Sequence, residues 1–202
     1  MRTPLSNRVR TRTSPRGFSL IELLLVILIM IVLFGITGPA ITSVLRGNDL
    51  NRAGWSFGDR LMLARQEALT KNCNVEVRFY KLPSGWSAVQ LWRVAPSQDG
   101  STPVPVALGS LVKAPSSVII DEQLSPLLNA DSTIAGTADL PYYHTVKYAG
   151  FRFRPNGSVS TVINSSNNYI TFKIASDPTE PPANNYTIQV DPVTGKIITF
   201  QP

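Results

Sequence analysis

The side chains of this sequence that could do acid–base, nucleophilic or metal chemistry are few and isolated. Cys73 is the one cysteine and His144 the one histidine among 202 residues. A single cysteine excludes an intramolecular disulfide and a cysteine metal cluster, and a single histidine excludes a His-pair metal site. No nucleophile-elbow or paired-carboxylate pattern is present. We therefore expect no enzyme, no metal or other cofactor and no small-molecule substrate. Cys73 is expected to be a buried structural thiol, and His144 an ordinary loop histidine.

Glu22 is chemically the most unusual residue, because it is the one ionisable side chain between Phe18 and Ile41. About 20 predominantly apolar residues suffice to cross a bilayer as a helix, so residues 18–41 are predicted to be a transmembrane helix. A charge in such a span costs about 2.5 to 3.5 kcal/mol at the helix centre, less near an end, and usually marks function. Glu22 therefore requires an explanation.

The residues before Glu22 supply this explanation. The order is a glycine (Gly17), an aromatic residue that opens an apolar run (Phe18) and an acid at the fifth position of that run (Glu22). The stretch Gly-Phe-Ser-Leu-Ile-Glu-Leu-Leu-Leu-Val resembles the type IV prepilin signature. The resemblance implies that a prepilin peptidase cuts after Gly17 and methylates the new amino terminus of Phe18. It also implies that residues 1–17 are a cleaved leader and that Glu22 serves assembly.

The charge distribution separates this leader from the rest of the chain. Of the 19 Lys and Arg residues, five precede Phe18 with no acid among them, which leaves 14 basic against 13 acidic residues after the cut. The net charge of +6 therefore reports mainly the leader and gives no evidence for nucleic-acid binding. By the positive-inside rule the leader stays cytoplasmic. We expect a single-pass inner-membrane protein with a periplasmic C-terminal domain. The five arginines are Arg2, Arg8, Arg10, Arg12 and Arg16.

Two other interpretations of the N-terminus remain open. One is a plain signal anchor in which Glu22 has no role. The other is a secretory signal peptide cut within the small residues of 35–39, but its apolar core would normally span about 7 to 15 residues. The apolar run here is longer and contains an acid.

After the apolar run, the pattern predicts that the helix continues. Gly38 and Pro39 favour a kink or local melting, since proline removes a backbone hydrogen bond and clashes with the preceding turn. Residues 42–72 then read as an amphipathic continuation that must pack on its own domain, with apolar residues spaced by three and four. A helix from Phe18 to about Thr70 would be about 80 Å long at 1.5 Å per residue. The apolar positions are Phe57, Leu61, Ala64 and Ala68.

Residues 73–202 are predicted to form a β-rich domain, because the apolar period changes from 3.6 to 2 at Asn74. A hairpin is expected from Asn74 to Val94, and Asn156-Gly157 is expected to supply the positive φ values of a tight turn. Further strands are expected over 169–175, 186–191 and 196–200. Residues 95–150 are rich in proline and are predicted to be a variable loop region with one short strand at 117–120. This region could be a contact surface or a neutral insertion. The predicted class is α+β and pilin-like, with a long N-terminal helix packed on an antiparallel sheet.

A second resemblance covers the helix end and the first hairpin. The run Ala64-Arg-Gln-Glu-Ala68, then Lys71-Asn72, a strand and Gly85-Trp86 resembles the H-type minor pseudopilins of type II secretion and the FimT-like minor pilins. The first family implies a filament subunit whose partners are other pilins or pseudopilins, the prepilin peptidase and the inner membrane. The second implies a minor pilin for DNA uptake. After Gly195 there is one lysine and no arginine, which argues against nucleic-acid binding at that end.

Two weaker hypotheses concern polar residues of the domain. Arg152 and Arg154 could grip a phosphate, but alternation with Phe151 and Phe153 favours a solvated strand face. Some pseudopilins bind calcium, and the acids available for it are Asp177, Glu180 and Asp191, although no spaced ligand loop is present.

Overall fold

The computed structural model describes residues 17–94, 103–129, 134–160 and 168–201, except for the side chains of 36–43 and of 129. The leader expected over 1–17 therefore lies outside the described residues except for Gly17. The chain divides into two compact units, Met1–Thr42 and Ser43–Pro202. The elements are α1 (Leu20–Lys71), β1 (Asn74–Leu82), β2 (Gly85–Val94), β3 (Val106–Lys113), β4 (Val118–Ile120), α2 (Pro126–Asn129), β5 (Ile134–Leu140), β6 (Tyr143–Phe153), β7 (Tyr169–Ile174), β8 (Asn185–Val190) and β9 (Ile197–Phe200).

Helix α1 buries the stripe that its sequence period predicts. Phe57, Leu61, Ala64 and Ala68 are all fully buried, which confirms the amphipathic continuation. The helix ends at Lys71 because Asn72 adopts a left-handed conformation with φ of 49°. The amide of Cys73 then donates to the carbonyl of Ala68 at 3.3 Å, which is the bond that closes a Schellman motif.

The helical backbone of α1 is continuous through Gly38 and Pro39. The structure therefore does not show the local melting that we considered there. The kink stays a prediction, and the side chains at this place are outside the described residues.

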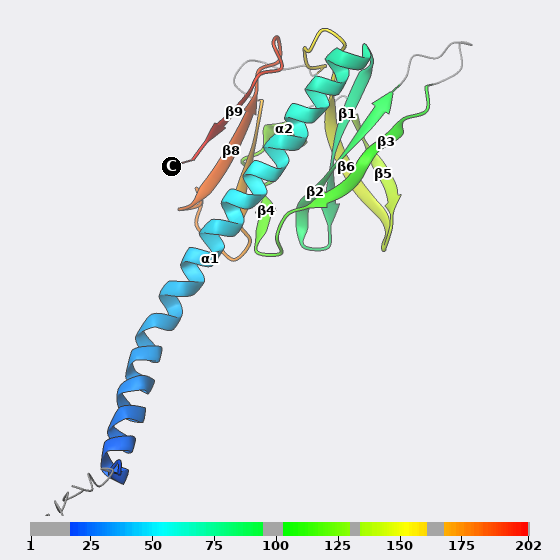
Figure 1. The fold of residues 1–202 in the computed structure, drawn as a ribbon. Helices are drawn as coiled ribbons and strands as arrows, with labels where there is room; N and C mark the ends of the chain where they lie inside the picture. Colours follow the sequence, from blue (N-terminus) through cyan, green and yellow to red (C-terminus); the bar gives the residue numbers. More distant parts are fainter. Residues whose placement is uncertain (1–16, 95–102, 130–133, 161–167, 202) are drawn as a thin grey trace, which may run out of the picture. The chain divides into compact units, whose positions relative to one another are not determined.

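The described strands form one antiparallel sheet, with the order β5-β6-β1-β2-β4-β7-β8-β9 and with β3 also paired to β2. The sheet divides at β2, where Trp86 pairs with β4 while residues from Ala88 to Arg93 pair with β3. Within the second unit, α1 crosses the sheet with β8 and β9 on one side and β1, β2, β3, β5 and β6 on the other (Figure 1). The predicted α+β class is confirmed.

The main core lies between α1 and the sheet, and aromatic rings form its centre. The ring of Phe57 stacks on Phe79 with 6.4 Å between centroids and meets Phe172 edge-on at 5.0 Å. Such pairs add about 0.5 to 1.5 kcal/mol each beyond the area that they bury. A second, smaller apolar cluster contains Tyr80 and Ala88, with contributions from β3 and β5. Both faces of this part of the sheet are therefore covered.

Within residues 95–150, the short strand predicted at 117–120 is confirmed as β4, but the prediction that the rest is a loop region was wrong. The described part of this range contains β3, β4, α2, β5 and the first residues of β6. Prolines suggested a loop, but they stand between elements or begin them: Pro105 precedes β3, Pro115 follows it, Pro126 opens α2 and Pro141 separates β5 from β6. Proline lacks a backbone donor and is tolerated at these boundaries. These prolines therefore mark the ends of elements and do not prevent strands from forming between them.

The predicted hairpin over 74–94 is confirmed, and the predicted turn at Asn156–Gly157 is present but differs in geometry and is followed by an isolated bridge between Phe153 and Val159. Strands β1 and β2 pair from Asn74↔Val94 to Leu82↔Gly85. At the second turn, Gly157 has φ of 82°, but Asn156 is not left-handed. The amide of Gly157 donates to the carbonyl of Arg154 at 2.8 Å. The turn therefore has a three-residue loop with glycine last, in which Asn156 instead accepts hydrogen bonds from Ser158.

Candidate functional site

The residues of the N-terminal motif lie at the start of α1. Gly17 and Phe18 precede the helix, and the Phe18 side chain is 76% exposed. The carbonyl of Ser19 accepts hydrogen bonds from the amides of Glu22 at 3.0 Å and Leu23 at 3.1 Å. The bond between Gly17 and Phe18 therefore lies outside the helix, between two exposed residues.

Glu22 lies in the first turn of α1. With Ser19 at the N-cap, the order Ser-Leu-Ile-Glu matches the capping-box pattern, in which an acid at the third helical position faces the unpaired amides. An acid near a helix N-terminus is also favoured by the helix dipole, by about 0.3 to 1 kcal/mol at an exposed site. The position of Glu22 therefore suits the helix itself. Among the described residues, no ion pair involves this carboxylate.

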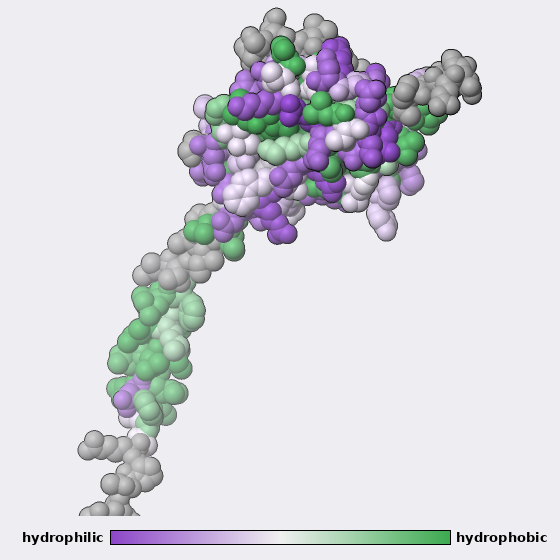
Figure 2. All heavy atoms as spheres, turned by 45° about the horizontal axis from the view of Figure 1, so that its top comes forward, coloured by the Kyte–Doolittle hydropathy of each residue, from purple (hydrophilic) through white to green (hydrophobic). Residues whose placement is uncertain are grey.

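The described side chains of the first unit form an apolar surface. The large residues from Leu20 to Phe34 are exposed, and Figure 2 shows their surface as hydrophobic, with a hydrophilic patch near its start. Within the part of the chain that the structure describes, no helix was found with a stretch long and apolar enough to cross a membrane.

The most deeply buried charged group of the described domain, Glu76, was missed from the sequence. Its side chain is 1% exposed and lies on the sheet face opposite α1. Arg78 donates to one carboxylate oxygen through Nε at 2.8 Å, and Arg152 donates to the other through Nε at 2.9 Å. Arg152 is therefore not the freely solvated strand residue that we predicted. The two arginine partners of Glu76 come from β1 and from β6, and Arg152 of β6 is 76 residues away in the chain, which local sequence does not reveal.

Aromatic rings enclose this ion-pair cluster. The guanidinium carbon of Arg78 lies 4.7 Å from the Trp92 ring centroid and 4.8 Å from that of Tyr148. Trp92 Nε1 donates to the hydroxyl of Tyr80 at 3.0 Å. Burial raises the pKa of Tyr80 above its ordinary value, outweighing the opposite effects of Trp92 and Arg78. The carboxylate is buried and both of its oxygens are bonded within the cluster, so we assign the cluster to stability rather than to binding.

Two of the three acids considered for calcium, Asp177 and Asp191, accept hydrogen bonds within their own turns. Asp177 accepts hydrogen bonds from Thr179, and Asp191 accepts them from the amides of Val193 at 2.9 Å and Thr194 at 2.8 Å. The pKa of Asp177 is lowered, first by its bond to the Thr179 hydroxyl, and that of Asp191 first by the Thr194 amide. Within the described ranges, no group of three or more His, Cys, Asp or Glu residues is arranged to hold a metal ion.

Cys73 and His144 lie in different environments, one in the core and the other at the surface. Cys73 is buried in the main core, as predicted. His144 is exposed but lies in strand β6 rather than in a loop. The loop prediction failed because Pro141 and Tyr142 form a short turn between β5 and β6, and pairing resumes at Tyr143.

No protein-family model matches the chain, and no curated protein matches it. Among solved structures, it is similar to the minor pseudopilin EpsH from the Type 2 Secretion System of Vibrio cholerae. The two are 12% identical with a TM-score of 0.42, over 76% of this chain and 98% of that chain. A likeness at this level carries no argument about function.

Proposed function

We propose that this chain is a minor pseudopilin: an inner-membrane protein whose leader is removed by a prepilin peptidase and which joins a filament through α1. The observation that carries the proposal is the order Gly17, Phe18 and Glu22 at the start of an exposed apolar helix. The α+β domain that follows, with the second half of the helix packed on an antiparallel sheet, has the architecture that such a subunit requires. On this proposal the chain catalyses nothing.

The mechanism is the transfer of a helix from lipid into a bundle of like helices. Small residues such as Gly35 and Gly38 permit close helix approach in such bundles. In the bundle, the carboxylate of Glu22 pairs with the methylated ammonium of a neighbouring subunit's Phe18. This pairing offsets the cost of burying Glu22 if the geometry is good. The C-terminal domain stays on the periplasmic side.

Cleavage is tested by changing the residue before the cut. Gly17→Trp, coexpressed with a prepilin peptidase, should keep its leader, because a bulky side chain blocks the small site that the peptidase recognises. Intact-mass measurement gives the result. Gly35→Trp is the matched control: it puts the same side chain at an exposed glycine inside α1, away from the cut, and should still be processed. Normal processing of Gly17→Trp would refute the assignment of the cut.

Assembly is tested at Glu22. Glu22→Leu removes the charge and keeps a helix-forming apolar residue, so insertion and cleavage should persist while crosslinking to filament partners falls sharply. The processed fraction is measured on the same gel as the crosslinks. Undiminished crosslinking would mean that Glu22 serves only the helix terminus, as its position in the capping box allows.

A further inference from the structure

Strand β9 is an edge strand of the described sheet. Within the described residues it pairs with β8 alone, from Val190↔Ile197 to Thr187↔Phe200. Its residues are exposed or half-buried, and Ile198 and Phe200 present apolar side chains to solvent. Native proteins usually shorten, charge or cover such an edge, because unpaired backbone groups invite another strand. None of the described strands pairs with β9 on its outer side.

The outward backbone groups of β9 can be assigned from its register. The carbonyl of Lys196 accepts a hydrogen bond from the amide of Asp191 at 2.8 Å, so Lys196 faces β8. Inward and outward residues alternate along an antiparallel strand. Ile197 and Thr199 therefore direct both their N–H and C=O groups away from β8, where an added strand could bind them.

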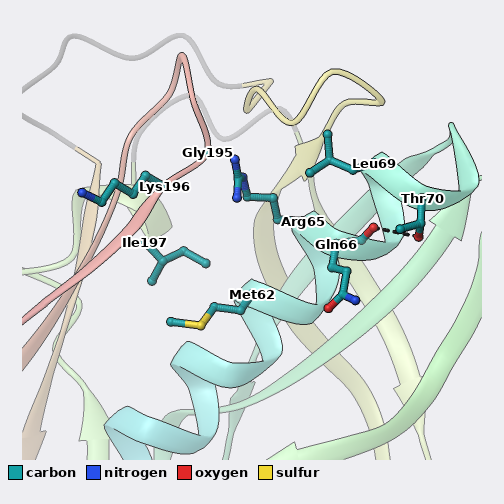
Figure 3. Close-up of a pocket in the computed structure, with 8 residues that line it drawn as sticks. All are labelled: Met62, Arg65, Gln66, Leu69, Thr70, Gly195, Lys196 and Ile197. Atoms are coloured by element: carbon teal, nitrogen blue, oxygen red, sulfur yellow. Dashed lines mark hydrogen bonds between the residues drawn. The ribbon is translucent and has the colours of Figure 1, made fainter.

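A groove lies between the start of strand β9 and helix α1. It has a volume of about 460 Å³ and is lined by Met62, Arg65, Gln66, Leu69 and Thr70 of the helix and by Gly195, Lys196 and Ile197. Figure 3 shows the side chains of Met62 and Ile197 on facing walls. The apolar walls can receive every second side chain of a strand that runs along β9.

One end of the groove is held in place by Arg65. Its Nε donates to the carbonyl of Thr194 at 3.0 Å, across 129 residues of chain. Gly195 has φ of 65°, and a Cβ there would clash with the carbonyl of Gly157. The turn is therefore packed against both the helix and the β6 turn, so that the edge is presented in a fixed position.

The charged side chains that line the groove indicate which kind of segment would bind there. Arg65 and Lys196 both line it, and among the described residues neither forms an ion pair with a carboxylate. We propose that β9 and the α1 groove bind an extended acidic segment of a partner protein, which adds a strand to the sheet and places carboxylates beside Arg65 and Lys196. The inference does not depend on the proposed function, because it uses only the second unit.

The proposal is tested with two labelled peptides and the full-length chain in detergent. The first peptide is capped Thr-Val-Asp-Val-Asp-Val-Thr, and the second carries lysine in place of both aspartates. The acidic peptide should bind about threefold tighter or more, as expected for exposed ion pairs, and the difference should shrink in high salt. Fluorescence anisotropy measures binding. Hydrogen exchange should show new protection at the amides of Ile197 and Thr199.

Two variants separate the backbone contribution from the charge contribution. Thr199→Pro removes one outward N–H without touching the bonds to β8, a place where edge strands tolerate proline. It should weaken both peptides by about three- to tenfold, the loss of one hydrogen bond. Lys196→Glu should remove the preference for the acidic peptide or reverse it. Arg52→Gln, an exposed cation of α1 outside the groove, should change neither.

Three results would overturn the proposal. The first is no binding of either peptide with unchanged exchange at Ile197 and Thr199. The second is equal affinity for the acidic and basic peptides. The third is self-association of the chain that Thr199→Pro abolishes, which would identify a second copy as the occupant.

Discussion

At the scale of single residues, Glu76 shows how a charge is accommodated inside a small sheet. The carboxylate is buried, Arg78 is nearly buried with 12% of its side chain exposed, and Arg152 remains 41% exposed. Removing one member of a buried ion pair leaves its partner without compensation, which costs more than the intact pair gains. Glu76 is therefore needed because the arginines are present, and the three residues must be considered together.

We predict that Glu76→Gln lowers the free energy of unfolding by about 3 kcal/mol, the lower end of the range for breaking a buried pair. The lower end applies because Arg152 can turn to solvent. Urea denaturation of the variant measures the loss. Glu122→Gln is the control, since Glu122 pairs with Lys81 where both side chains are exposed, by 48% and 41%, and this substitution should cost about 1 kcal/mol or less. Equal losses in the two variants would contradict the assignment.

Asp121 gives a prediction for pH. Burial raises the pKa of its carboxyl, but the hydrogen bonds from Lys173 and from the amides of Leu124 and Gln123 together outweigh burial and lower it. A lowered pKa contributes stability above the unfolded value of about 3.9, and this contribution is lost as pH falls through the folded value. Asp121→Asn should therefore flatten the decline of stability below about pH 4. An unchanged slope in acid urea titrations would contradict this.

At the scale of elements, two glycines of α1 test how the helix contacts β8. A Cβ on Gly54 would overlap the ring of Tyr186, whereas a Cβ on Gly58 would lie 4.0 Å from the nearest side-chain atom, Cδ1 of Ile188. Alanine favours a helix interior over glycine by about 1 kcal/mol. Gly58→Ala should therefore stabilise the protein by up to that amount.

We expect Gly54→Ala to be destabilising by about 1 to 3 kcal/mol despite its helix propensity, because overpacking displaces the Tyr186 ring. Thermal unfolding of both variants distinguishes the effects. A stabilised Gly54→Ala would show that α1 and β8 can separate freely at this position.

Local patterns predicted α1, the β1–β2 hairpin and strands β7 to β9. In each of these elements, apolar residues recur with the period of a helix or a strand, and residues of this pattern pack in the core or against it. The period of 3.6 on α1 and of 2 on β1 both lead to fully buried positions such as Phe57 and Phe79. Strands β3 and β5 were missed because they are mostly exposed and interrupted by glycine. The burial of Glu76 could not be predicted either, because its partner Arg152 lies on the neighbouring strand β6, 76 residues away in the sequence.

At the scale of the whole molecule, apolar residues serve two purposes. Those of the first unit are exposed along the helix, and on the proposed function they contact lipid or other helices. The buried residues of the main core all lie between Leu50 and Val190, inside the second unit, Ser43–Pro202. The core of the domain therefore uses none of the exposed apolar residues of the first unit. On the proposed function, folding and membrane insertion would use separate sets of residues, so that one could change without the other.

The last prediction follows from this separation: residues 45–202 should fold without the apolar segment. The buried aromatic residues Phe57, Tyr80 and Phe172 belong to this part, so near-UV circular dichroism should show a fixed tertiary signal, and gel filtration should give a compact soluble species. Aggregation with a retained near-UV signal would be assigned to the free β9 edge if Thr199→Pro restored the compact species. A molten product without near-UV signal would instead show that the helix-on-sheet core needs the first unit, and would contradict the independence of the two units.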